Sequence, residues 1–278
     1  MVLRGLGLAL LALLARAADA AAQGVLVAPH AVYLDHRTRS AAITLYNPGA
    51  EPAEVTISSV YGYPVTDSLG HFTLFLPDSV EPGMPAATGW VEAFPRRMTI
   101  APLERQTVRL LARPPQGLAD GEYWSRVVIS AQGGTVPVSG AADSSGITIG
   151  LTLEIRTIIP LLYRKGQLNT ALAVQSLTAT RAGDSLQVRA HLSRQGSGAW
   201  IGTARGALRA PGGKVAASFD LPLAIYYDAD PVLSLPVAGL PTGTYQLVLE
   251  FLTERADLMP EQILRAPVVR DSLTVQLP

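Results

Sequence analysis

The stretch ITIGLTLEIRTIIPLLYR, residues 147–164, alternates apolar and polar side chains over most of its length. A period of two is typical of a β-strand with one apolar and one polar face. Fully extended, the stretch would form a strand of about 17 residues and roughly 55 Å, whereas strands commonly have about 5–6 residues. A single sandwich cannot cover a strand of this length. It is therefore either a long core strand that ends at a domain linker or a strand that offers its apolar row to a partner.

The composition excludes several classes of function. Lys and Arg number 22, as do Asp and Glu, so the chain lacks the basic excess typical of nucleic-acid-binding proteins. The absence of cysteine excludes disulfides, Cys-ligated zinc and thiol catalysis. The 25 Gly and 21 Pro favour many short strands joined by turns over long helices. We therefore expect an all-β protein.

The N-terminus has the pattern of a secretory signal peptide. Arg4 supplies the positive charge, Gly5 to Leu14 form the apolar segment, and small residues follow to Ala22. The apolar run is shorter than the ~20 residues that span a bilayer, which disfavours an uncleaved anchor helix. We predict a signal peptide at residues 1–22, an exported and periplasmic mature chain, and no later membrane span.

The first half of the mature chain contains seven or more strand signals separated by short turns. Asn47-Pro48-Gly49 is a strong turn signal, Pro77 to Gly89 indicates an excursion loop, and Gln132 to Gly146 indicates a flexible loop before the long strand. This spacing predicts an immunoglobulin-like β-sandwich over residues 23–163. An unrelated antiparallel barrel is the alternative.

The strand pattern restarts after Lys165-Gly166 and predicts a second immunoglobulin-like sandwich over residues 164–278. A short internal echo supports two similar domains, because the pattern Leu-x-x-Gly-x-Tyr that ends at Tyr123 recurs at Tyr245. In each copy a Gly turn leads into a strand whose early Tyr fits a tyrosine corner. There the hydroxyl group bonds to the backbone a few residues upstream.

Motifs for catalysis are absent. None of the four histidines has a metal-ligand spacing, and the chain lacks G-x-S-x-G, P-loop and G-x-G-x-x-G motifs. Asp228 and Asp230 could contact calcium, but no third acid is close and Ca²⁺ prefers about 6–8 oxygen ligands. Glu250 and Glu254 leave a glycosidase pair open as a less favoured alternative. We expect no enzyme activity, no metal and no cofactor.

Five short motifs occur in one order along the first half. They are VYLDHRTR (32–39), ITLYNPG (43–49), FPRRMTIAPLERQTVRL (94–110), DGEY (120–123) and LLYR (161–164). In these motifs the chain resembles the periplasmic pilus-assembly chaperones of Gram-negative bacteria, which are two-domain immunoglobulin-like proteins. The resemblance covers residues 25–164. The second half is similar only in its domain size and in the turn before Tyr245.

The resemblance implies an assembly chaperone that binds pilus or surface-fibre subunits by donor-strand complementation. In that family the last strand of the first domain completes the unfinished sandwich of a subunit. An outer-membrane usher is a further candidate partner, and an exposed apolar strand also favours self-association. The subunit-binding side chains would be Leu151, Leu153 and Ile155, with Ile149 and Ile147 extending the row.

The resemblance also implies an anchor for the C-terminal carboxylate of the subunit. Arg39 matches the family's arginine, and Arg37 could serve instead. The family's lysine position falls on Pro160, whose side chain cannot bind a carboxylate. Either Arg156 or Arg164 therefore substitutes, or the anchor is absent.

A structural or adhesive immunoglobulin-like protein of the cell envelope is the alternative function. In that case the long strand would be buried in the core of its own domain. The two hypotheses differ in a property of the structure, namely the exposure of the apolar row.

Overall fold

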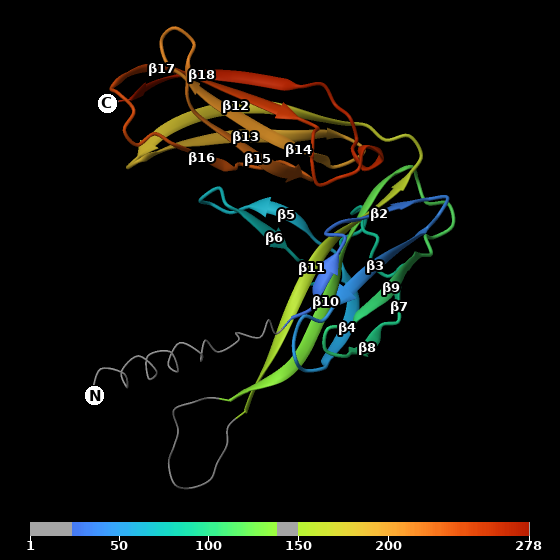
Figure 1. Ribbon diagram of the computed structural model, residues 1–278. Coiled ribbons are helices and arrows are strands. Elements are labelled where there is room, and N and C mark those ends of the chain that lie inside the picture. The colour runs from blue at the N-terminus through green and yellow to red at the C-terminus, as the bar shows by residue number, and fades with distance from the viewer. Residues whose placement is uncertain (1–23, 138–149, 278) are drawn as a thin grey trace, which may run out of the picture.

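The computed structural model describes residues 24–137 and 150–277, and this part of the chain forms two β-sandwiches (Figure 1). The predicted signal peptide, Ile147 and Ile149 lie outside the described residues. Within the described residues there is one 3-10 helix, Pro260–Gln262, and no α-helix. No helix in this part of the chain is long and apolar enough to cross a membrane. The all-β, immunoglobulin-like prediction is confirmed.

The first sandwich packs a sheet of four strands against a sheet of five. The first sheet has the order β1-β3-β9-β7 and the second has the order β2-β11-β10-β4-β8. The strands of the first sheet are β1 (Leu26–Ala28), β3 (Ser40–Tyr46), β9 (Arg105–Ala112) and β7 (Val91–Phe94). Those of the second sheet are β2 (Val32–Asp35), β11 (Gly150–Lys165), β10 (Gly121–Pro137), β4 (Ala53–Val60) and β8 (Arg97–Ile100).

The two strands at the start of the chain belong to different sheets. β1 pairs antiparallel with β3, whereas β2 pairs parallel with β11. Pro29 lies between them, and a proline cannot donate a hydrogen bond to a continuing ladder. The apolar stretch from Val25 to Leu34 therefore forms two short edge strands, one in each sheet.

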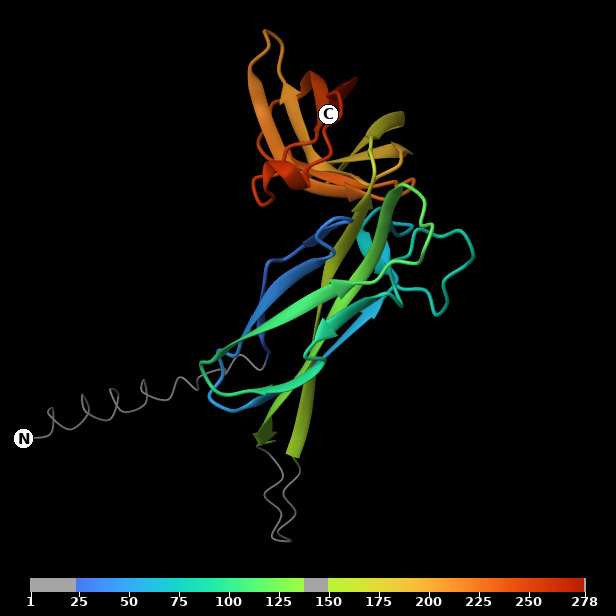
Figure 2. The ribbon, with the colours of Figure 1, turned by 90° about the vertical axis from the view of Figure 1, so that its right-hand side faces the viewer.

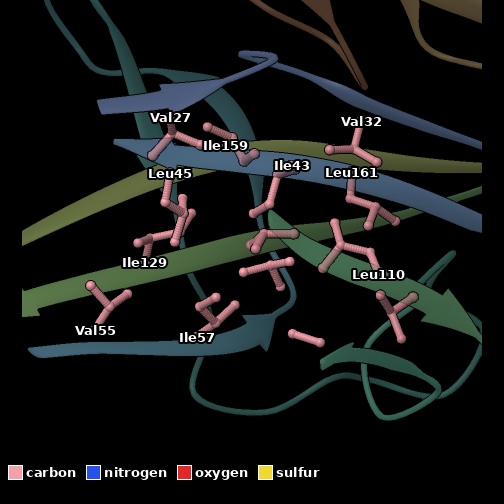
Figure 3. Close-up of a cluster of buried hydrophobic side chains, with 14 of the residues drawn as sticks. Val27, Val32, Ile43, Leu45, Val55, Ile57, Leu110, Ile129, Ile159 and Leu161 are labelled. Atoms are coloured by element: carbon pink, nitrogen blue, oxygen red, sulfur yellow. The ribbon is translucent and has the colours of Figure 1, made fainter. Parts of the chain in front are cut away.

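The core of the first sandwich lies between its two sheets (Figure 3). Ile43 and Leu110 from one sheet meet Ile129, Ile159 and Leu161 from the other, and all five are buried. Along each strand they alternate with residues whose side chains point to the other face of the sheet, as the period of two requires. This packing fixes which face of β11 points inward.

β10 and β11 form a long antiparallel ribbon that continues past the end of its neighbour β4. Their pairing runs from Gly121 opposite Lys165 to Pro137 opposite Gly150. The pairing of β10 with β4 extends only to Gly133, which lies opposite Ala53, the first residue of β4. A loop beginning at Gln132 was therefore the wrong expectation. The strand continues through an irregularity between Gln132 and Thr135.

The second sandwich packs a sheet of order β12-β13-β16 against one of order β15-β14-β17-β18. Its strands are β12 (Thr170–Ala182), β13 (Ser185–Gly196), β14 (Trp200–Arg209), β15 (Val215–Ile225), β16 (Val232–Pro236), β17 (Gly243–Leu252) and β18 (Val269–Leu277). Both tyrosine corners are confirmed. The Tyr123 hydroxyl donates to Ala119 O and the Tyr245 hydroxyl to Pro241 O, each at 2.9 Å.

A small hairpin, β5 (Tyr63–Thr66) with β6 (Phe72–Phe75), belongs to neither sandwich. It projects from the first sandwich into the space beside the second (Figure 1), and Figure 2 shows the same arrangement from the side. Aromatic side chains gather at its base, where Tyr63 contacts Trp124 and Tyr227 at centroid distances of 6.3 and 4.8 Å. The two sandwiches and the hairpin thus meet around one aromatic cluster.

Candidate functional site

One edge of β11 is open over most of the strand. β10 pairs with β11 along its whole length, but β2 pairs with its other edge only from Leu161 to Arg164. Among the described residues, no strand pairs with that edge between Gly150 and Pro160. An open edge presents unpaired backbone donors and acceptors to any chain that can align with it.

The apolar row of β11 runs from the core out to solvent along one face. Ile159 and Leu161 are buried in the core, whereas Leu153 on the same face is 41% exposed. Ile155 is half-buried because its side chain packs against the backbone of Gly24. Leu151 continues the strand opposite Val136, but its side chain lies outside the described residues.

The middle of β11, from Thr157 to Ile159, borders a groove between the two sheets of the first sandwich. This groove has a volume of about 660 Å³ and is lined by Leu26, Thr44, Tyr46 and Ile159, among others. Because β1 is the edge strand of its own sheet, the groove separates two open edges. The open edge of β11 therefore passes beside a largely apolar depression, where an added strand could bury side chains.

A second cavity, of about 600 Å³, lies on the opposite face of β11 and between the two sandwiches. Ile158 and Pro160 line it from β11, and Tyr226 lines it from the second sandwich. Pro160 lies directly opposite Arg126 in the ladder, and Arg126 also lines the cavity. The position where the resemblance expects a lysine therefore has an arginine as its cross-strand neighbour.

Arg126 is a buried cation, with 6% of its surface exposed. Its Nε donates to Gly62 O at 3.0 Å, and its guanidinium carbon lies 5.2 Å from the centre of the Tyr226 ring. None of the ion pairs among the described residues includes Arg126. Burial raises the pKa of Tyr33 and of Tyr226 on the walls of the cavity, so both hydroxyls stay neutral. A buried arginine without a carboxylate partner favours binding of an anionic group.

Arg37 and Arg39 lie in the turn between β2 and β3, and neither lines this cavity. The Arg39 Nε donates to His36 O at 2.7 Å, and Arg39 has a positive φ of 53°. Arg37 is fully solvated beside Asp35, with 3.8 Å between charged atoms. Their role as carboxylate anchors stays a prediction, and it would require Arg39 to leave its bonds to His36.

Arg156 lies on the polar face of β11, where its Nε donates to the Glu154 carboxylate at 2.8 Å. It is exposed to solvent and does not line the cavity. The Arg156 guanidinium, by its hydrogen bond, also holds the pKa of Glu154 below its usual range. An incoming carboxylate would have to compete with Glu154 for this arginine.

Arg164 is bound between the two sandwiches. Its Nε donates to Glu122 at 2.8 Å, its Nη1 donates to Gln262 O at 2.7 Å, and its guanidinium stacks over Tyr33 at 4.7 Å. The Glu122 side chain is 0% exposed and also accepts from Ala199 N at 2.9 Å. Arg164 and Glu122 therefore connect β10 and β11 to the second sandwich.

Three of the acidic side chains that could have indicated calcium binding or an enzyme, Asp228, Asp230 and Glu250, have other partners. Asp230 accepts from His191 Nδ1 at 2.7 Å, Asp228 accepts from Ser193 at 2.8 Å, and Glu250 pairs with Arg270 at 2.6 Å. Within the described ranges, no group of three or more His, Asp or Glu side chains could hold a metal ion.

No protein-family model matches the chain, and no curated protein sequence matches it. Among solved structures, the chain is similar to the YadV chaperone, with a TM-score of 0.44, 17% identity, and coverage of 90% of this chain and 99% of that one. It is also similar to the structure of the SafA pilin with the SafB chaperone from Salmonella enterica (TM-score 0.38, 15% identity, 91% and 96% covered). A third similar structure is the CupB2 chaperone from Pseudomonas aeruginosa (TM-score 0.39, 12% identity, 91% and 100% covered). At such identities, an assignment of function depends on the geometry of this chain.

Proposed function

We propose that the protein is an exported, periplasmic assembly chaperone that binds pilus or surface-fibre subunits by donating the open part of β11. The observation that carries the proposal is the free edge from Gly150 to Pro160 together with the exposed Leu153. A subunit strand aligned with this edge would gain ladder hydrogen bonds, and the apolar row would set its register. An outer-membrane usher is a further proposed partner.

Burial of the row can account for a stable complex. The row consists of Leu151, Leu153 and Ile155 on β11, with Ile149 and Ile147 as the extension. Five such side chains, at about 1.5–3 kcal/mol each, would contribute on the order of 10 kcal/mol before ordering costs. The alternative, a structural or adhesive envelope protein, expects this row to be covered by its own domain, and the exposure of Leu153 disfavours it.

Replacing Leu153 by glutamate tests the proposal directly. A carboxylate in the donated row would be buried without a partner, so the variant should fold but should lose its bound subunit. The measurement is recovery of exported proteins that co-purify with the tagged chain, quantified by mass spectrometry.

Leu221→Glu is the matched control, because Leu221 is an exposed leucine on β15 of the second sandwich. It should retain the subunit. Equal recovery with L153E, L221E and the wild-type chain would contradict strand donation. Absence of every subunit from the wild-type chain would contradict the chaperone function itself.

We further propose that Arg126 supplies the cation for the subunit's terminal carboxylate, in place of the lysine that Pro160 replaces. The support is its position opposite Pro160, its burial and its lack of an ion pair among the described residues. Arg255 also lines the cavity, but it is already paired with Asp257 at 2.6 Å. Among the arginines of this cavity, Arg126 is therefore the better candidate.

Arg126→Met should weaken subunit binding by about 10- to 100-fold, the range expected when a charge-assisted hydrogen bond is lost. Titration of the isolated subunit by fluorescence anisotropy would measure the change. A subunit whose C-terminus is extended by several residues should bind the wild-type chain and R126M equally weakly. If R126M lowers the affinity for both subunits by the same factor, Arg126 has a structural role and is not the anchor.

A further inference from the structure

The β5–β6 hairpin is held by the second sandwich at its tip. Asp230 N donates to Thr66 Oγ1 at 2.8 Å, and Val232 N donates to Gly70 O at 3.0 Å. Gly70 has a φ of 85°, and a Cβ atom there would lie only 2.5 Å from the Val232 side chain. Isolated two-stranded hairpins are marginally stable in water, so these contacts fix its position.

The fixed hairpin nevertheless exposes large apolar side chains. All four residues of β6 are exposed, including Phe72 at 39% and Leu74 at 38%. Leu69 at the tip and Leu76 after the strand are exposed as well. Contiguous exposed apolar side chains on a soluble domain commonly mark an interaction site. Phe72 and Leu74 share one face of the hairpin because they are two residues apart.

This face adjoins the end of the open edge of β11. Leu74 lines the same cavity as Ile158 and Pro160. A strand added to β11 has room only as far as Pro160, because β2 occupies the edge from Leu161. The added strand must therefore end at this point, beside the cavity that Leu74 lines.

We infer that Phe72 and Leu74 form a second contact for the bound subunit and receive apolar side chains of the last residues of its added strand. The inference rests on the proposed function and names a contact outside the donated strand. Because the hairpin is fixed before binding, this contact requires little additional ordering. Burial of the two side chains should strengthen binding by about tenfold or more.

The test uses the subunit that co-purifies with the wild-type chain, prepared as the complex. The variant F72S/L74S should weaken its binding by about tenfold or more, measured by competition with the wild-type chain. V215S/V268S is the control, because both valines are exposed and belong to the second sandwich. Hydrogen exchange of the wild-type complex provides a measurement without substitution, and the amides of residues 72–76 should exchange more slowly than in the free chain.

The outcomes separate this inference from the proposed function. If L153E loses the subunit while F72S/L74S binds like the wild-type chain and the amides of residues 72–76 stay unprotected, the hairpin contact is wrong and strand donation stands. If the wild-type chain binds no subunit, both are wrong. If F72S/L74S fails to fold, amide protection at residues 72–76 decides alone.

Discussion

Replacing Glu122 by alanine should lower the free energy of unfolding by about 3–5 kcal/mol, the cost expected when one partner of a buried ion pair is removed. Arg164 would remain nearly buried beside Tyr33 without its counter-charge. Trp124 Nε1 and Ala199 N would also lose the carboxylate that accepts their hydrogen bonds. Urea denaturation followed by tryptophan fluorescence would measure the loss.

The variant should also uncouple the two sandwiches. Glu122 and Arg164 lie in β10 and β11, whereas Ala199 and Gln262 belong to the second half of the chain, so the hydrogen bonds of this pair cross the junction. We expect a single unfolding transition in the wild-type chain and two transitions in E122A. Arg205→Ala removes an exposed ion pair with Asp220 and should cost at most about 1 kcal/mol. A loss in E122A no larger than in R205A would show that this pair does not hold the junction.

Local sequence patterns predicted the two sandwiches because their strands alternate in the period of the β-sheet. The tyrosine corners were predictable as well, because each depends on a Gly turn and a Tyr within a few residues. In the sequence, Glu122 appeared only as a member of the DGEY motif, and its role at the junction could not be predicted. Its partners Arg164 and Ala199 are 42 and 77 residues away, and no local pattern encodes such contacts.

The candidate site was predictable only in part for the same reason. The alternation of apolar and polar residues identified the apolar row of β11. It does not show which strands lie next to β11, because strand order in a sheet does not follow from the period of two. Arg126 was missed because its importance comes from lying opposite Pro160 in the ladder. The hairpin contact was missed because Phe72 and Leu74 acquire their position from bonds at Thr66 and Gly70 to the second sandwich.

Two glutamate substitutions on the same face of β11 should differ strongly in their effect on stability. Leu161→Glu would bury a carboxylate at a position that is 0% exposed, within the core between the two sheets. The loss of apolar burial and the unpaired charge together should cost more than about 4 kcal/mol and unfold the first sandwich. Leu153→Glu leaves the charge in water and should change the free energy of unfolding by about 0.5 kcal/mol or less.

This pair of variants distinguishes the two functions without any partner. If the long strand served only its own domain, Leu153 and Leu161 would contribute alike, and both variants would melt at a much lower temperature than the wild-type chain. A strand that is core at Leu161 and donor at Leu153 predicts a low melting temperature for L161E alone. Thermal unfolding monitored by circular dichroism would measure both. An exposed apolar row on an open edge adds little to the stability of its own domain. Burial of these side chains in a complex would explain why the strand carries them.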